Sequence, residues 1–139
     1  SRRWQLYDTF EGIPDDQLDP GWADSNKRAY KGTFSYDEVR ERFAHIPNIE
    51  VIKGRVPEVL AGRVPDRIAF LHVDMNNATA EIAALDALFD RITPGGLIVF
   101  DDYVWTASRA QYDAEKQWFA DRGCVVLPLP TGQGLFVKS

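Results

Sequence analysis

Residues 96–103 read Gly-Leu-Ile-Val-Phe-Asp-Asp-Tyr, and this stretch decides which fold the chain adopts. Four apolar residues lead directly into two adjacent carboxylates, Asp101 and Asp102. Residues 67–74, Arg-Ile-Ala-Phe-Leu-His-Val-Asp, have the same arrangement, with Asp74 at the end. Near-continuous apolar runs are typical of strands that are buried on both faces of a parallel sheet. We therefore predict two such strands, each ending in acidic residues.

Strands and helices alternate along the rest of the sequence. Ser35 and Glu38 form a capping box that opens a helix, which we expect to end before Pro47. In order, we predict strands at 4–10, 49–54, 67–74 and 97–102, helices over 35–46, 57–62, 82–92 and 112–119, a turn at 93–96, and two closing strands at 124–130 and 134–139. This alternation indicates an α/β fold with a mostly parallel sheet and an antiparallel C-terminal hairpin. Residues 11–33 are polar and too long for a simple connection, so we expect a functional loop or a lid.

Composition excludes several classes of protein. The chain of 139 residues is long enough for one domain with its own core. Its net charge of -5 argues against a nucleic-acid surface. No apolar run approaches the roughly 20 residues that span a bilayer, so no membrane partner is expected. The single cysteine, Cys124, excludes an internal disulfide and suits a reducing cytoplasm, and one Cys with two His disfavours structural zinc.

The acidic strand ends predict a metal site. Ligands of open α/β sheets bind beyond the carboxyl ends of the strands, and neighbouring strands lie about 4.8 Å apart. If residues 67–74 and 97–102 are neighbours, Asp74, Asp101 and Asp102 converge and repel one another unless a cation neutralises them. Oxygen ligands select Mg²⁺, Ca²⁺ or Mn²⁺ over zinc. The alternative is that the Asp-Asp pair is a solvated turn and helix cap.

Three further positions near the strand ends have two interpretations each. Asp8 ends the first predicted strand, where a carboxylate accepts hydrogen bonds from ribose hydroxyls, but it also suits a loop cap before Thr9. His72 lies in a predicted buried strand, as a satisfied core histidine or as a group that contacts Asp74 or a cofactor. Tyr103 and Trp105 either form the wall of a pocket or pack in the core.

Three motifs together resemble those of the TylF-type family, the macrocin-like O-methyltransferases. They are Leu-Tyr-Asp-Thr-Phe-Glu-Gly-Ile-Pro at 6–14, Leu-His-Val-Asp at 71–74, and Arg-Ile-Thr-Pro-Gly-Gly-Leu-Ile-Val-Phe-Asp-Asp-Tyr at 91–103. The spacing from His72 to Asp101 matches the family pattern without a gap, and the resemblance covers essentially the whole chain. It implies a Rossmann-like class I methyltransferase domain over residues 1–139. It also implies transfer of a methyl group from S-adenosylmethionine to a hydroxyl, such as a sugar hydroxyl, of a small molecule.

The resemblance also implies roles for individual residues. Asp74, Asp101 and Asp102 would bind Mg²⁺, and Asp74 would also be the base for the acceptor hydroxyl. The residues expected to contact the S-adenosylmethionine cofactor are Asp8 at the ribose, Thr9 and Phe10 near the adenosine, Gly54 and Arg55 near the adenine, and His72.

The sequence departs from the family pattern in two ways. Asn76 stands where the family usually has a second Asp, and the Tyr two residues later is missing. The chain also begins at the family's second strand, so we expect the first strand and its glycine-rich loop to lie outside this sequence. That strand would be placed in the middle of the sheet, between the strands that end at Asp8 and Asp74.

These departures leave an alternative open. The chain is either an O-methyltransferase or a catalytically inactive, methyltransferase-like binding or regulatory module. A nicotinamide-dependent oxidoreductase is disfavoured because no Gly-x-Gly-x-x-Gly precedes the strand that ends at Asp8. Neither the acceptor nor the formation of a homo-oligomer follows from the sequence.

Overall fold

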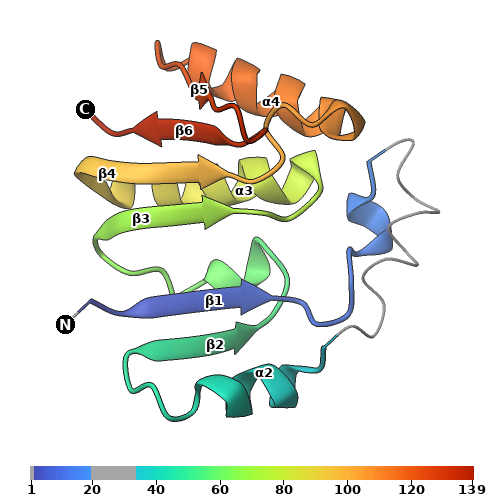
Figure 1. Cartoon of the computed structure of the whole chain (residues 1–139), viewed down its shortest axis with the longest axis vertical. Coiled ribbons are helices and arrows are strands. Elements are labelled where there is room, and N and C mark those ends of the chain that lie inside the picture. The colour runs from blue at the N-terminus through green and yellow to red at the C-terminus, as the bar shows by residue number, and fades with distance from the viewer. Residues whose placement is uncertain (1, 20–33) are drawn as a thin grey trace.

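The computed structural model describes residues 2–19 and 34–139, and it forms two sheets (Figure 1). In the first sheet β1 (Trp4–Asp8) pairs in parallel with β2 (Ile49–Lys53). The second sheet has the strand order β3-β4-β6-β5, with bounds Ile68–Val73, Ile92–Phe100, Gly134–Val137 and Leu127–Pro128. β3 and β4 are parallel, whereas β6 is antiparallel to both β4 and β5. The predicted α/β class with an antiparallel C-terminal hairpin is confirmed.

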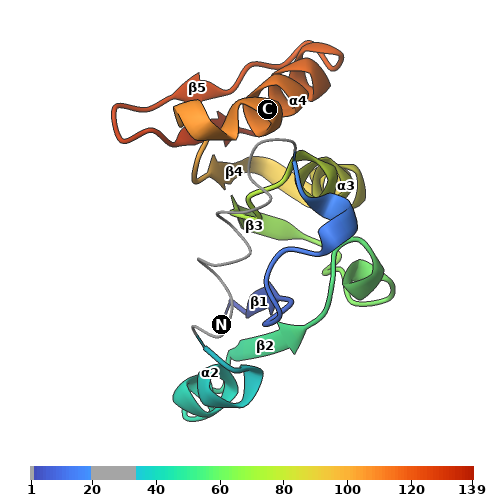
Figure 2. The ribbon, with the colours of Figure 1, turned by 90° about the vertical axis from the view of Figure 1, so that its right-hand side faces the viewer.

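Two helices form the core against one face of the second sheet (Figure 2). These are α3 (Ala78–Leu88) and α4 (Arg109–Ala120), which pack on each other as well as on the strands. The aromatic rings of Phe89, Phe119 and Phe136 pack on one another in this core in edge-on and tilted orientations, with centroids 4.8 to 5.9 Å apart. The buried apolar cluster comprises Leu60, Ile68, Val73, Ala84, Leu85, Leu88, Phe89, Ile92, Ile98, Phe100, Tyr103, Trp118, Phe119, Val126 and Phe136.

The remaining helices are short and are fixed by local signals. The predicted capping box opens α2 (Tyr36–Phe43): the Ser35 hydroxyl accepts from the Glu38 N–H, and the Glu38 carboxylate accepts from the Ser35 N–H at 2.8 Å. Pro57 precedes a single 3-10 turn, η2, in place of the longer predicted helix. The 3-10 turns are η1 (Asp15–Gln17), η2 (Glu58–Leu60), η3 (Phe89–Arg91) and η4 (Thr106–Ser108).

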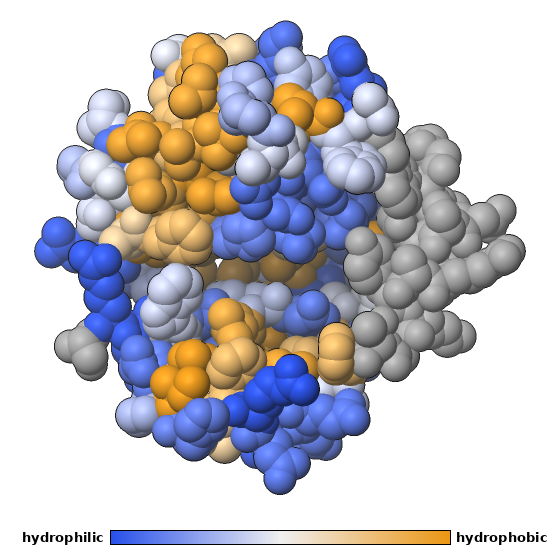
Figure 3. Space-filling view, viewed as in Figure 1, coloured by the Kyte–Doolittle hydropathy of each residue, from blue (hydrophilic) through white to orange (hydrophobic). Residues whose placement is uncertain are grey.

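The prediction that residues 67–74 are buried on both faces is wrong. Phe70 is 42% exposed, and Leu97 and Val137, beside it on β4 and β6, are exposed as well. Apolar side chains gather on this side of the second sheet, which is turned to the viewer in Figure 3. The reason is that α3 and α4 both lie on the opposite face, so within the described residues only one side of these strands is covered.

The prediction of a chain reversal at residues 93–96 is also wrong, because these residues belong to β4. The register advances from Ile68 opposite Ile92 to Phe70 opposite Leu97, so the β4 side contains extra residues at this point. Gly95 has a φ of 78°, which a residue with a side chain rarely adopts, and its N–H donates to the Lys138 carbonyl at 2.8 Å. The Pro-Gly-Gly sequence therefore makes a bulge that bends the strand without ending it.

The two sheets meet without a ladder between them. β1 and β3 are neighbours and point the same way in Figure 1, but neither pairs with the other. The rings of Trp4 and Phe70 are in contact across the junction, with centroids 5.7 Å apart. Figure 3 shows a hollow between the two parts of the molecule at this place.

Two further predictions concern the loop or lid at residues 11–33 and membrane-spanning segments. Residues 11–19 of the predicted loop or lid lead from β1 into η1, whereas residues 20–33 lie outside the described residues. No helix in residues 2–19 or 34–139 has the length and apolar character that a membrane span requires.

The burial of Phe119 predicts that this residue contributes strongly to the free energy of unfolding. Phe119 is 1% exposed, so the Phe119→Ala variant should lose about 3–5 kcal/mol of unfolding free energy through lost burial and the cavity left behind. Urea unfolding followed by circular dichroism measures this loss. Phe70→Ala is the matched control and should lose less than about 1.5 kcal/mol because its ring is half exposed. Equal losses in the two variants would contradict the assignment of the core.

Candidate functional site

The parallel pairing of β3 with β4 brings three carboxylates together, as predicted. Asp74 follows β3, and Asp101 and Asp102 follow β4. The pairing continues one residue beyond the strands, because the Asp101 N–H donates to the Val73 carbonyl at 3.0 Å. One oxygen from each carboxylate lies within 4.8 Å of the other two. We refer to Asp74, Asp101 and Asp102 as the acidic cluster.

Repulsion inside the acidic cluster changes the proton affinity of its members. Two like charges 4 Å apart repel by about 1 kcal/mol in bulk water and by about 4 kcal/mol at an effective dielectric constant of 20. The pKa of Asp74 is raised, first by desolvation of its carboxyl and then by the charges of Asp101 and Asp102. Desolvation and the charge of Asp101 likewise raise the pKa of Asp102. The cluster therefore favours binding of a positive charge, whether a proton or a cation.

The described groups that contact the acidic cluster are neutral donors and one histidine. The Asn76 side-chain amide donates to Asp74 Oδ1 at 3.1 Å, and the Gln133 amide donates to Asp101 Oδ1 at 3.0 Å. His72 Nε2 lies 3.7 Å from Asp101 Oδ1. Within the described part of the chain no lysine or arginine forms an ion pair with the cluster. Among residues 2–19 and 34–139, the cluster therefore has no lysine or arginine countercharge.

Gln133 is a contact of the cluster that sequence reasoning missed. It lies in the turn between β5 and β6, next to Gly134, which pairs with Phe100 immediately before Asp101. The antiparallel hairpin was predicted, but its register was not. Only that register places the turn, and with it the Gln133 amide, beside the carboxylates.

His72 and the two aromatic residues after the cluster occupy different environments. The His72 side chain is 43% exposed and faces Asp101, so the interpretation of His72 as a core histidine does not hold. Tyr103 is buried and packs on Phe100 and Tyr112, with ring centroids 6.0 and 5.1 Å apart, whereas Trp105 is exposed. Of the two interpretations of Tyr103, the structure favours packing.

Asn76 has a conformational role that explains part of the departure from the family pattern. Its φ is 55°, in the left-handed region, where Asn and Asp are tolerated better than other residues with side chains. The same turn points its amide at Asp74. An Asp in this place would have the same backbone tolerance but would add a negative charge to the acidic cluster, so Asn lowers the repulsion there.

Residues 8–10 form a compact turn at the end of β1. The carboxylate of Asp8 accepts from the Phe10 N–H at 2.6 Å, and the Thr9 hydroxyl donates to the Gly12 carbonyl at 2.7 Å. Phe10 has a φ of 56°, and its ring meets that of Tyr36 edge-on at 5.4 Å. The predicted loop cap at Asp8 is therefore present, and the Thr9 hydroxyl is engaged in the turn.

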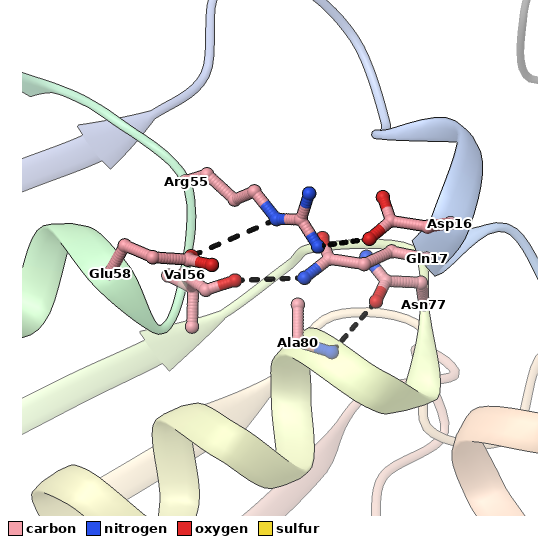
Figure 4. Close-up of polar contacts among 7 residues, drawn as sticks. All are labelled: Asp16, Gln17, Arg55, Val56, Glu58, Asn77 and Ala80. Atoms are coloured by element: carbon pink, nitrogen blue, oxygen red, sulfur yellow. Dashed lines mark hydrogen bonds and ion pairs between the residues drawn. The ribbon is translucent and has the colours of Figure 1, made fainter.

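The end of β2 places Gly54 beside Asp8 and Arg55 beside η1. The Gly54 N–H donates to the Asp8 carbonyl at 3.0 Å, and a Cβ at Gly54 would lie 2.5 Å from Val59 Cγ2, so packing alone requires glycine here. Arg55 donates to the Asp16 carboxylate of η1 at 2.6 Å and lies 3.7 Å from that of Glu58 (Figure 4).

The polar contacts around Arg55 fasten η1 to the body of the chain. Gln17 is buried, and its amide donates to the Val56 carbonyl at 2.8 Å (Figure 4). In the same view Asn77 caps α3, its side-chain oxygen accepting from the Ala80 N–H at 2.7 Å. β1, β2, β3 and β4 all point the same way in Figure 1, so Asp8, Gly54 and the acidic cluster lie at one edge of the molecule.

Comparison with known proteins identifies a family and relatives that are similar to this chain. The family model described as macrocin O-methyltransferase (TylF) matches residues 1–122. A Streptomyces olivaceus protein, the 8-demethyl-8-(2,3-dimethoxy-alpha-L-rhamnosyl)-tetracenomycin-C 4'-O-methyltransferase, is 27% identical over 117 residues, which cover 78% of this chain and 45% of that protein. The chain thus spans about half the length of this relative.

Solved structures show the same fold. The O-methyltransferase NovP superimposes with a TM-score of 0.82 at 20% identity, covering 99% of this chain and 60% of NovP. The calicheamicin methyltransferase CalS11 superimposes with a TM-score of 0.73 at 22% identity, covering 98% of this chain and 60% of CalS11. An apo structure of CalS11, described there as a TDP-rhamnose 3'-O-methyltransferase, gives a TM-score of 0.62 at 20% identity and covers 98% and 58%.

The left-handed turn at Asn76 generates a stability prediction. Asn76→Ala places a Cβ-bearing residue without a local hydrogen bond in this conformation and should cost about 1–2 kcal/mol of unfolding free energy. Asn76→Gly removes the same contact with Asp74 without the steric conflict, so it should unfold at a higher urea concentration than the Ala variant. An Ala variant as stable as the Gly variant would show that the left-handed conformation is not maintained.

The raised pKa values generate a pH prediction with a definite sign. The pKa of both Asp74 and Asp102 is raised above the ordinary 3.8, so in the folded chain these groups hold protons that the unfolded chain has already released. Their contribution to stability is present below the ordinary pKa and is lost as the pH rises through the raised value. In EDTA at pH 7, Asp102→Asn should therefore raise Tm, and the gain should shrink towards pH 3.

The control for this titration is Asp113→Asn. Arg109 lowers the pKa of the Asp113 carboxyl through a 2.8 Å hydrogen bond, so its neutralisation should give no gain in Tm at pH 7. Differential scanning calorimetry across the pH range compares the two variants. A Tm for Asp102→Asn at or below that of the unmodified protein at pH 7 would contradict the repulsion described above.

Proposed function

Because the chain belongs to the macrocin O-methyltransferase (TylF) family, we propose that it forms the core of an enzyme that transfers a methyl group from S-adenosylmethionine to a sugar hydroxyl. The observation that carries the proposal is the acidic cluster at the ends of two paired parallel strands, where ligands of α/β sheets bind. Two relatives support the acceptor class, since the Streptomyces olivaceus enzyme and CalS11 are both named for methylation of rhamnose units.

The donor set of the acidic cluster fits a hard divalent cation. Asp74, Asp101 and Asp102 would hold Mg²⁺, since all three offer carboxylate oxygens and none has a lysine or arginine partner in the described chain. When bound, such a cation supplies Lewis acidity that lowers the pKa of a hydroxyl beside it. The amides of Asn76 and Gln133 would keep two of these carboxylates oriented.

The protein's own contribution to the chemistry is to orient the acceptor and to remove its proton. S-adenosylmethionine, when bound, supplies a methyl group on a positively charged sulfur that leaves as a neutral thioether. As the acceptor hydroxyl oxygen takes that methyl carbon, the Asp74 carboxylate would accept the hydroxyl proton.

The cofactor would lie at the adjoining strand ends. Asp8 would accept hydrogen bonds from the ribose hydroxyls, with Thr9 and Phe10 beside the adenosine, and the adjacency of Asp8 and Gly54 supports this placement. Arg55 fixes η1 through its hydrogen bond to Asp16. A contact from Arg55 to the adenine would be made with the side chain in this same position. His72, exposed beside Asp101, would lie between the cofactor and the acidic cluster.

Mutation of the acidic cluster tests the proposal in the intact natural protein. Transfer of labelled methyl from S-adenosylmethionine to TDP-rhamnose and to rhamnosylated aglycones should fall at least about 100-fold in Asp101→Ala/Asp102→Ala, because the electrostatic stabilisation at the acceptor is lost. EDTA should abolish activity of the unmodified protein, and Mg²⁺ should restore it. Asp113→Ala, an exposed carboxylate on α4, should leave the rate unchanged. Undiminished transfer by the double variant would refute the role of the cluster.

Calorimetry distinguishes an enzyme from an inactive binding module. The intact protein should release heat on binding S-adenosylhomocysteine, and Asp8→Ala should weaken that binding by roughly 10-fold, as expected for loss of a carboxylate hydrogen bond. Asp101→Ala/Asp102→Ala should leave it within a factor of three. Absence of heat would favour an inactive methyltransferase-like module, and binding of S-adenosylhomocysteine without methyl transfer to any rhamnoside would favour a module that binds only the nucleoside.

A further inference from the structure

A buried polar cluster lies between α3 and α4. It consists of Glu81 on α3 and of Gln111 and Glu115 on α4, and both glutamates are 2% exposed. Burial of carboxyl groups is costly unless they are hydrogen-bonded or neutralised, and apolar residues of similar volume are often as stabilising or more so. The core of this small domain therefore contains two carboxyl groups that packing alone does not require.

The contacts of Glu81 explain what the cluster holds. Glu81 Oε1 accepts from the Met75 N–H at 3.1 Å and from the Gln111 amide at 3.0 Å. Glu115 interacts with Glu81: burial and then the charge of Glu81 raise the pKa of Glu115 to about 10, so the pair retains a proton at neutral pH. Glu115 Oε2 is buried and has no partner in the described chain.

Met75 is the residue immediately after Asp74, and both of its backbone groups are held. Its N–H donates to Glu81, and its carbonyl accepts from the Asn77 side-chain amide at 2.9 Å. Asn76, between them, adopts the left-handed conformation. The turn that leads from β3 into α3 is thus fixed from the helix interface behind it, and the direction of the Asp74 side chain depends on that turn.

We propose that Glu81 is a positioning residue for Asp74: oriented by Gln111, its carboxyl anchors the Met75 N–H and so holds the turn that places Asp74 in the acidic cluster. The inference rests on the proposed function of that cluster as a cation site. The polar cluster therefore supports the cation site from behind the turn that follows β3.

The test separates positioning from stability by removing the whole polar cluster. The triple variant Glu81→Leu/Gln111→Leu/Glu115→Leu has no buried carboxyl and no unpaired partner among the three, so it should unfold at a urea concentration equal to or above that of the intact natural protein. It lacks an acceptor for the Met75 N–H. The matched control is Glu115→Gln, which keeps a neutral donor to Glu81.

Two readouts compare these variants. Amide hydrogen exchange by NMR should show the Met75 N–H exchanging at least tenfold faster in the triple variant. Mn²⁺ titration followed by electron paramagnetic resonance should show affinity lowered about 10- to 100-fold, the usual effect of losing a group that orients a metal ligand. Glu115→Gln should leave both within a factor of two. A folded triple variant with unchanged Met75 exchange and unchanged Mn²⁺ affinity would overturn the proposal.

Two other outcomes also test the positioning role of Glu81. If the triple variant does not fold, Glu81→Gln replaces it, because its uncharged oxygen is the weaker acceptor for Met75. An Mn²⁺ affinity at least fivefold lower at unchanged unfolding free energy then supports positioning, and an unchanged affinity overturns it. If the unmodified protein binds no Mn²⁺, the cation role of the acidic cluster fails instead, and Met75 exchange alone decides whether Glu81 holds the turn.

Discussion

The parallel ladder between β3 and β4 brings three carboxylates from two distant parts of the sequence to one place. These carboxylates repel one another, and the other described groups of the site contact them without cancelling their charge. The ladder extends one residue past the strands through the Asp101 N–H, so Asp74 and the Asp101–Asp102 pair emerge side by side. In the described part of the chain no lysine or arginine pairs with them, and His72 is the one ionisable side chain of another type beside Asp101. A sheet that concentrates negative charge in this way is suited to a ligand that carries positive charge.

The groups around the acidic cluster restrain its geometry without neutralising it. Asn76 and Gln133 donate single hydrogen bonds to Asp74 and Asp101. Behind the turn after β3, Glu81 holds the Met75 N–H from a buried position. These contacts come from a loop, a hairpin turn and a helix, so the carboxylates are constrained from several directions while their charge remains available.

The edge of the molecule that carries the acidic cluster also carries the end of β1. Asp8 and Gly54 lie next to each other there, and the Arg55–Asp16 pair fastens η1 nearby. A cation site and a site for a nucleoside would therefore share one edge of a parallel α/β arrangement, as transfer between two bound molecules requires. The sheet of β1 and β2 meets the larger sheet through contacts such as Trp4 with Phe70.

Local patterns in the sequence were sufficient for the elements and for the identity of the carboxylates. Ser35 and Glu38 predicted the start of α2, and the apolar runs before Asp74 and Asp101 predicted two strands, because capping and apolar patterns depend on residues close in the chain. The motifs also identified the family. The tertiary structure decided the rest, since each remaining feature depends on which distant residue lies opposite. The bulge at Gly95, the exposure of His72, the arrival of Gln133 beside Asp101 and the burial of Glu115 against Glu81 all follow from strand register and helix packing, which no local pattern specifies.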